Sequence, residues 1–122
     1  MAIYGTDGDD VLSGDKWMYG EGGNDRLIGS ILDDHLYGGA GDDWLIAGPG
    51  LSDDNLFGGA GIDTADYSTS NGGVTVNLAE GWGSGGDADR DTFDSIGNVV
   101  GSSLNDQLIG SSVGNLLSGG SG

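Results

Sequence analysis

Several residue types that define common classes of protein are missing or scarce in this chain of 122 residues. There is no cysteine, so disulfides and thiolate metal sites are excluded, and oxygen atoms are the only abundant metal ligands. There is one proline, Pro49, and no apolar run is long enough to span a bilayer. Only Lys16, Arg26 and Arg90 are basic against 20 acidic residues, so the net charge is −17 and no basic stripe could bind nucleic acid.

Glycine and acidic residues are what the chain has in abundance. The 28 glycines favour turns with unusual backbone dihedral angles over helices. Hydrophobic residues make up 35% of the chain, which gives a single domain of this length little apolar surface to bury. The carboxylates repel one another, and a cation that binds only the folded chain is the usual remedy. The composition therefore indicates a hard cation.

Glycine-rich turns recur every nine residues in the first half of the chain. They begin at Gly20, Gly29, Gly38 and Ala47, and the units read GEGGNDRLI, GSILDDHLY, GGAGDDWLI and the eleven-residue AGPGLSDDNLF. The unit GTDGDDVLS and a six-residue stub, GDKWMY, precede them, and GGAGIDTAD follows. Position six is acidic in every nine-residue unit, and repetition at a fixed period indicates a solenoid.

Each unit has the composition of a turn followed by a short strand. The glycines of the first six residues permit positive φ and let carbonyl oxygens point inward, and the eighth residue faces the interior. Two units complete one coil, so residues eighteen apart stack, with Leu27 beside Leu45 and Asp25 beside Asp43. This pattern predicts an all-β fold, a β-solenoid. Its predicted interior positions are Leu12, Met18, Leu27, Leu36, Leu45, Leu56 and Ala65.

The well-formed turns alternate with irregular ones, so the two edges of the solenoid should differ. Edge I carries the turns 5–10, 20–25, 38–43 and 58–63, and edge II carries the stub and the turns 29–34 and 47–54. We expect a column of ions on edge I, between Asp10 and Asp25, Asp25 and Asp43, and Asp43 and Asp63. On edge II only Asp34 and Asp54 are in phase, and Lys16 replaces an acid, so we expect one weak site there or none.

The chain divides into a repetitive roll, residues 1–67, and an extension, residues 68–122, which we expect to form one continuous solenoid. Residues 74–78 alternate like a strand, and residues 80–91 read as a glycine-rich loop. Asp87, Asp89 and Asp91 in this loop lack the glycine of an EF-hand, which leaves another kind of cation site or a solvated loop. From Thr92 the nine-residue phase returns, with Asp106 alone at position six. Val99, Leu108 and Leu117 are the predicted interior positions there.

The units GGAGDDWLI and GGAGIDTADYS resemble the RTX, or hemolysin-type, calcium-binding repeat, whose pattern is G-G-x-G-x-D-x-U-x. The resemblance implies a right-handed parallel β-roll with calcium bound between stacked turns, export by type I secretion to the cell exterior, and a place in a larger secreted polypeptide. Both ends of the sequence read as cuts from such a polypeptide. The implied carboxylate ligands are Asp10, Asp25, Asp43 and Asp63, with Asp34, Asp54, Asp87, Asp89, Asp91 and Asp106 as further candidates. The implied carbonyl ligands are those of Gly8, Gly20, Gly22, Gly23, Gly38, Gly39, Ala40, Gly41, Gly59 and Gly61.

Three functional classes compete for such a chain. The G-x-S-x-G match at residues 110–114 lies inside a repeat turn without the elbow that exposes a nucleophile, so we expect no enzyme. Trp17, Trp44 and Trp82 could bind a polysaccharide or a cell surface in a calcium-dependent accessory module, as in adhesins or alginate epimerases. The class we favour is a monomeric spacer or folding module that folds when it binds calcium outside the cell.

Overall fold

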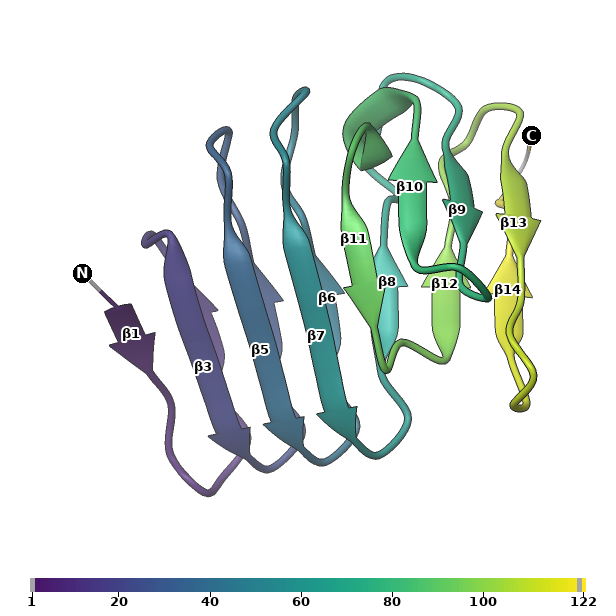
Figure 1. Cartoon of the computed structure of the whole chain (residues 1–122). Coiled ribbons are helices and arrows are strands. Elements are labelled where there is room, and N and C mark those ends of the chain that lie inside the picture. Colours follow the sequence, from purple (N-terminus) through teal and green to yellow (C-terminus); the bar gives the residue numbers. More distant parts are fainter. Residues whose placement is uncertain (1, 121) are drawn as a thin grey trace.

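The computed structural model describes residues 2–120 and 122. Met1 and Ser121, at the two ends that read as cuts, lie outside the described residues. The chain winds into a solenoid with two sheets facing each other (Figure 1). The eight-stranded sheet has the order β1 (Ala2–Tyr4), β3 (Trp17–Gly22), β5 (His35–Ala40), β7 (Asn55–Ala60), β11 (Thr92–Asp94), β10 (Trp82–Ser84), β9 (Thr75–Asn77) and β13 (Gln107–Ile109). The six-stranded sheet has the order β14 (Leu116–Ser118), β12 (Asn98–Val100), β8 (Thr64–Asp66), β6 (Trp44–Ile46), β4 (Arg26–Ile28) and β2 (Val11–Ser13). The predicted all-β parallel roll is confirmed.

The pairing follows the two-unit coil that the sequence predicts. Successive units alternate between the sheets, so strands one coil apart pair in parallel, and Leu27 pairs with Leu45 in the six-stranded sheet. In the eight-stranded sheet, Leu36 pairs with Leu56 across the eleven-residue unit, so the two extra residues bulge at edge II and leave the register intact. Among the described residues, no helix is long and apolar enough to cross a membrane.

The core is a single column of small and medium side chains between the sheets. Position eight is almost completely buried throughout the roll, at Met18, Leu27, Leu36, Leu45, Leu56 and Ala65, and Val99 continues this column. Leu12 and Leu108, near the ends, pack against the column but are only partly buried. Leu117 pairs with Val99 as predicted but is 37% exposed, because β14 is the last strand of its sheet. Its predicted burial is therefore wrong.

The extension widens the solenoid with an antiparallel excursion. Strand β9 lies within the predicted strand 74–78, but the predicted loop 80–91 contains β10 and the short 3-10 helix η1 (Gly86–Ala88). The chain reverses at Gly81, whose φ is 80°, and its N–H donates to the carbonyl of Asn77. Residues 92–94 form β11 beside β7 rather than the start of a turn. The nine-residue phase resumes only after this strand.

Candidate metal centre

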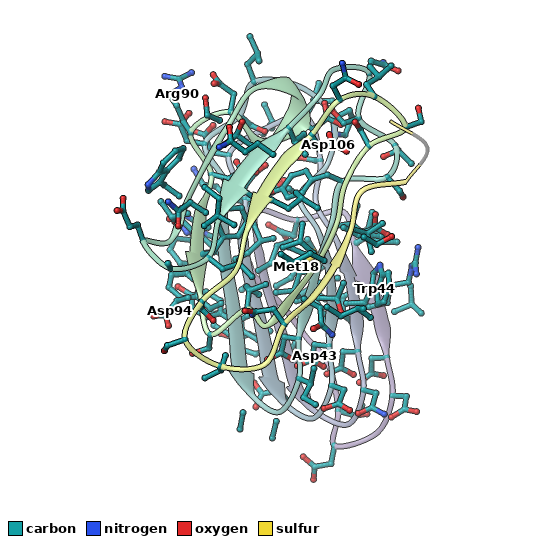
Figure 2. The ribbon with its side chains drawn as sticks, turned by 90° about the vertical axis from the view of Figure 1, so that its right-hand side faces the viewer. Met18, Asp43, Trp44, Arg90, Asp94 and Asp106 are labelled. Atoms are coloured by element: carbon teal, nitrogen blue, oxygen red, sulfur yellow. The ribbon has the colours of Figure 1, made fainter. Side chains whose placement is uncertain are left out.

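The turns of edge I stack directly on one another. Strands β3, β5 and β7 run on into these turns, so Glu21 pairs with Gly39, and Gly39 with Gly59. Each turn then delivers its position-six aspartate to the start of β4, β6 or β8. Figure 2 shows Asp43 toward one edge of the roll and Asp106 toward the other, with Met18 between them. The repeat therefore builds a column of aspartates along edge I, as the sequence predicts.

One oxygen of each edge I aspartate ties neighbouring coils together. Asp25 Oδ1 accepts the backbone N–H of Asp10, Asp43 Oδ1 accepts that of Asp25, and Asp63 Oδ1 accepts that of Asp43, each at 2.8 Å. These three aspartates are at most 2% exposed. These hydrogen bonds and the burial fix the orientation of the three side chains. The second oxygen of each, Oδ2, is therefore held in one position.

That second oxygen accepts no hydrogen bond from any described residue. Oδ2 of Asp25, Asp43 and Asp63 is buried and unpartnered, as are Asp34 Oδ1 and Asp106 Oδ2 elsewhere. A buried polar atom without a partner costs about 1–3 kcal/mol, and more when it carries charge. Three such oxygens in one column call for a bound cation.

The first glycine of each turn makes room for these oxygens. A Cβ at Gly20 would collide with Asp25 Oδ2 and the carbonyl oxygen of Gly38, and a Cβ at Gly38 would collide with Asp43 Oδ2 and the carbonyl oxygen of Gly58. Gly20 and Gly38 do not have positive φ, so the need for glycine here is steric. A carboxylate oxygen and a carbonyl oxygen of the next turn thus converge on one small space.

Further carbonyl oxygens point along the column from positions two and four. A Cβ at Gly39 would collide with the carbonyl oxygen of Glu21, and one at Gly41 with that of Gly23. The same relation links Gly59 to the oxygen of Gly39 and Gly61 to that of Gly41. These glycines have φ between 96° and 126°, which glycine adopts at little cost. Of the other predicted carbonyl residues, Gly22 and Ala40 pair with each other in the ladder, as Gly39 and Gly59 do, and the Gly8 oxygen lies against Gly23.

The first turn of edge I differs because Thr6 satisfies its aspartate. The backbone N–H and the hydroxyl of Thr6 donate to Asp10 Oδ2 at 2.6 and 2.9 Å. Position two is Glu21, Gly39 or Gly59 in the other turns, and none of these donates to its aspartate in the described contacts. In this turn, the donors of Thr6 therefore occupy the carboxylate oxygen that has no partner in the other three turns of edge I.

The aspartates of edge II form a second column, but hydroxyl groups take the place of a metal. Asp54 Oδ1 accepts the N–H of Asp34, and Asp91 Oδ1 accepts that of Asp54. The second oxygens accept from hydroxyls: Asp34 Oδ2 from Ser30, Asp54 Oδ2 from Ser52, and Asp91 Oδ2 from Tyr67, the last at 2.5 Å. Asp34 Oδ1, at the end of this column, has no partner among the described residues. The sequence analysis placed Asp91 in a separate loop site and overlooked this stacking on Asp54.

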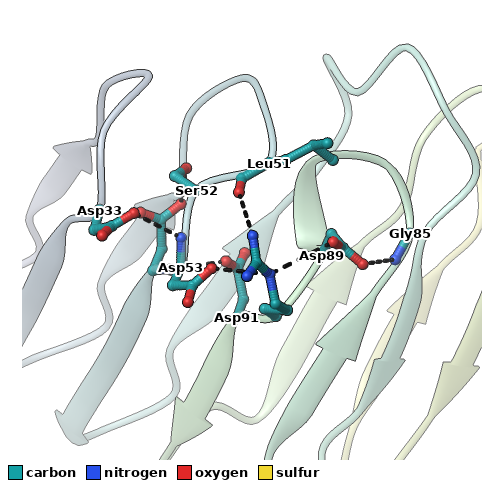
Figure 3. Close-up of polar contacts among 9 residues, drawn as sticks. Asp33, Leu51, Ser52, Asp53, Gly85, Asp89 and Asp91 are labelled. Atoms are coloured by element: carbon teal, nitrogen blue, oxygen red, sulfur yellow. Dashed lines mark hydrogen bonds and ion pairs between the residues drawn. The ribbon is translucent and has the colours of Figure 1, made fainter.

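The other two acids of that loop have partners different from those of Asp91. Asp87 Oδ1 accepts the N–H of Gly50, and Asp89 Oδ1 accepts that of Gly85. Arg90 Nε lies 3.8 Å from Asp89 Oδ2 and 3.1 Å from Asp53 Oδ1. Figure 3 shows Asp53 and Asp89 in this region, with the polar contacts as dashed lines. The loop is thus docked on the enlarged turn 47–54, and Asp87, Asp89 and Asp91 do not converge on a cation.

Asp106 belongs to edge II, where it closes the turn 101–106. Its Oδ1 accepts the N–H of Val74 and the hydroxyl of Ser102 at 2.9 and 2.7 Å. On edge I, Gly97 and Asn115 stand where further aspartates would lie. Asn115 donates to the carbonyl of Gly97 and accepts the N–H of Ser111, so an amide holds the last turn together.

Burial disfavours ionisation of both aspartate columns. Burial, with a smaller contribution from neighbouring carboxylates, raises the pKa of Asp25 and Asp43 above 3.8 and that of Asp63 to about 6. On edge II, burial raises the pKa of Asp54 to about 7 and that of Asp91 to about 8. A divalent cation beside the edge I oxygens would favour their ionised form.

A ladder of hydrogen bonds at position five was not predicted from the sequence. Asp9 Oδ1 accepts the N–H of Asn24, Asn24 Oδ1 accepts that of Asp42, and Asp42 Oδ1 accepts that of Ile62, each at 2.8 Å. The recurrence of Asp or Asn at position five, in DD, ND and DD, was the available signal. In this ladder the N–H of the later coil donates to the side chain of the earlier coil. At position six the N–H of the earlier coil donates to the side chain of the later one.

Trp17 and Trp44 do not share one face of the roll. Trp17 lies in β3 and Trp44 in β6, on opposite sheets, and Trp17 stacks on His35 with ring centroids 3.9 Å apart. Beside it, Tyr4, Tyr19, Tyr37 and Phe57 form a row stacked at 4.5–5.0 Å. Binding of a polysaccharide by the tryptophans stays a prediction.

The donors of edge I fit a hard cation. Calcium takes six to eight oxygen ligands, from carboxylates, backbone carbonyls and water. Among the described residues no three acidic or histidine side chains gather in one metal cluster. Each space in the column instead offers an aspartate oxygen with carbonyl oxygens, which is a mixed ligand set of the kind calcium accepts.

A parallel β-solenoid with oxygen-lined, glycine-rich turns belongs to the class of β-rolls. The sequence profile of the RTX calcium-binding nonapeptide repeat matches the chain in four copies, over residues 2–16, 19–51 and 50–65. These matches cover half of the chain, which therefore belongs to the RTX family of calcium-binding repeats, a structural and non-catalytic module. No curated protein and no solved structure matches the chain.

Proposed function

We propose that this chain is a calcium-dependent folding module, or spacer, of a larger secreted protein. The observation that supports the proposal is the column of buried, unpartnered Oδ2 atoms on edge I. Without a cation these atoms are desolvated and uncompensated, so the closed roll is disfavoured. With a cation they become ligands, and closure of the roll is favoured.

Two of the proposed ions lie between well-formed turns. One is held by Asp25 Oδ2 and the carbonyl of Gly38, and the other by Asp43 Oδ2 and the carbonyl of Gly58, each with carbonyls of positions two and four. These ions correspond to two of the three sites proposed from the sequence. The site between Asp10 and Asp25 is not part of this proposal, because Thr6 occupies the oxygen it would need.

Calcium concentration would then decide whether the chain is folded. Extracellular calcium modules have dissociation constants of roughly 10⁻⁴–10⁻³ M, so they are empty in a cell and occupied outside it. At ten times its dissociation constant, one site stabilises the fold by about 1.4 kcal/mol. A chain of net charge −17 gains additionally from neutralisation, and it would pass an export channel unfolded before it folds outside.

Circular dichroism of the whole chain, with calcium and with a chelator, tests the proposal. We expect strand signal in calcium and a largely disordered spectrum in chelator. Magnesium serves as the matched control, because it demands a smaller octahedral site and gives up its water reluctantly, so it should restore little structure. A chain that is equally folded in chelator would refute calcium-dependent folding.

A further inference from the structure

Asn71 lies in the segment that connects β8 to β9, and its side chain is exposed. Five of the seven asparagines form side-chain hydrogen bonds that hold their amide groups, namely Asn24, Asn55, Asn77, Asn98 and Asn115. Asn71 and Asn105 form none with any described residue, and both are exposed. These two amide groups are therefore free to react, and asparagine is among the chemically labile residues of proteins.

The residue that follows each of these two asparagines differs. Gly72 follows Asn71, and Asp106 follows Asn105. The backbone nitrogen of the following residue can attack the side-chain Cγ of an asparagine, and a Cβ on that residue crowds the approach, whereas glycine has none. Gly72 N–H donates only a long hydrogen bond, 3.4 Å to Ser70 Oγ, so this nitrogen is weakly held. Among the described residues, Asn71 alone thus combines a free amide group with an unhindered neighbouring nitrogen.

We infer that Asn71 is a site of spontaneous deamidation, a modification in which water is the only co-reactant. Gly72 N forms a bond to Asn71 Cγ, its proton joins the departing side-chain amide, and the loss of ammonia leaves a succinimide. Water then adds to one of the two ring carbonyl carbons, and the bond from that carbon to the nitrogen breaks. Cleavage at Cγ gives aspartate, and cleavage at the main-chain carbonyl carbon gives isoaspartate, whose backbone runs through Cβ and Cγ. This chemistry does not depend on the proposed calcium binding.

The modification falls where the segment packs against η1. Ser70 Oγ donates to the carbonyl oxygen of Gly72 at 2.8 Å and accepts the N–H of Asp87, in η1, at 3.0 Å. A Cβ at Gly86 would collide with Ser70 Oγ and with the Gly72 oxygen, so the segment lies directly against η1. Isoaspartate inserts an extra methylene into the main chain before Gly72 and displaces these contacts. Deamidation therefore loosens the extension, and it adds a negative charge to a net charge of −17.

Incubation of the whole chain at neutral and at mildly alkaline pH, followed by peptide mapping with mass spectrometry, tests the site. We expect Asn71 to convert to aspartate and isoaspartate, and faster at the higher pH, because the Gly72 nitrogen must lose its proton. Asn105, which is exposed and followed by Asp106, is the matched internal control and should keep its amide group. Gly72→Ala places a Cβ beside the attacking nitrogen, at a position without positive φ, and should lose most of the isoaspartate. Equal conversion of Asn71 and Asn105, or an intact Asn71, overturns the inference.

Amide hydrogen exchange of fresh and aged chains, both in calcium, tests the structural consequence. The Asp87 N–H, which donates to Ser70 Oγ, should exchange faster in the isoaspartate fraction. Asn71→Asp adds the same charge with an ordinary backbone, so its Asp87 N–H should exchange as in the fresh chain. Equal exchange in the fresh chain and the isoaspartate fraction, or equally fast exchange in Asn71→Asp, overturns loosening by the lengthened backbone. The response to calcium decides the proposed function separately, because Asn71 belongs to neither aspartate column.

Discussion

Replacement of Asp43 by asparagine separates the metal-binding role of this residue from its structural role. Asp43 Oδ1 accepts the N–H of Asp25 at 2.8 Å, and its Oδ2 is the unpartnered oxygen beside Gly58. Asparagine keeps the first contact and replaces the second oxygen with an amide group that cannot bind calcium. The variant should therefore fold in the same way but respond less to calcium.

The size of the effect follows from linkage between binding and folding. Near saturation, each site adds about 1.4 kcal/mol to the free energy of unfolding for every tenfold rise in calcium. Asp43→Asn should lower this slope by about 1.4 kcal/mol per tenfold, since one site is lost. Asp43→Ala should cost about 1–3 kcal/mol more at every calcium concentration, because the buried N–H of Asp25 then has no acceptor.

Urea denaturation at several calcium concentrations, spread over about a hundredfold range, measures this slope. Asp10→Asn is the matched control, with the same change of charge in the same column, and its slope should equal that of the original chain. A parallel displacement of the Asp43→Asn line, with no change of slope, would show that Asp43 supports the coil without binding metal. The proposed role of its Oδ2 would then be untenable.

Three further predictions address the parts of the roll around this column. Thr6→Gly removes the hydroxyl bound to Asp10 Oδ2 and permits the positive φ that Glu21, Gly39 and Gly59 adopt at position two, in turns where the backbone N–H does not occupy the aspartate, so calorimetric titration should detect one additional calcium ion; an unchanged count would show that the backbone N–H of residue 6 still occupies this oxygen. Tyr67→Phe leaves Asp91 Oδ2 without its donor and should cost about 1–3 kcal/mol at every calcium concentration; a loss that grows with calcium would link edge II to the metal. In chelator, lowering the pH from 8 to 5 should increase the strand signal in circular dichroism, because the raised pKa values of Asp54, about 7, and Asp91, about 8, make the folded chain bind protons before the unfolded chain does. This contribution is present at low pH and is lost as the pH rises from about 4 through these pKa values, so a signal that rises with pH would refute it.

The repetitive half of the fold could be predicted because its period appears in the sequence at every level. Three features repeat together: leucine at position eight, glycine at positions one and four, and aspartate at position six. Each of them alone predicts the same two-unit coil. Pairing of Leu27 with Leu45, and of the Asp25 and Asp43 coils, followed directly from a spacing of eighteen residues. The extra residues near Pro49 did not disturb the register, because they lie in a turn and not in a strand.

The extension could not be predicted as well, because its contacts join segments without a common period. Strand β10 forms against β9 through a reversal at Gly81, and the glycine-rich composition of residues 80–91 gave no sign of it. The stacking of Asp91 on Asp54 depends on the length of the whole excursion between β8 and β11. The edge I column was predictable in position, but the aspartate spacing alone does not reveal that the backbone N–H and the hydroxyl of Thr6 occupy Asp10 Oδ2.

The two edges of one coil should respond to calcium together even though the proposed ions lie on edge I alone. A coil closes only when both turns are formed, and edge II contributes hydrogen bonds from Ser30, Ser52 and Tyr67 as soon as its turns are in place. Each proposed ion on edge I bridges two turns, and the turn 38–43 is shared by two ions. Binding of the first ion thus positions half of the ligands for the second, and stability in a solenoid passes between neighbouring coils in this way. The strand content should for this reason rise more steeply with calcium than it would for independent sites. The hydrogen bonds of edge II supply the part of the free energy of coil formation that does not depend on metal.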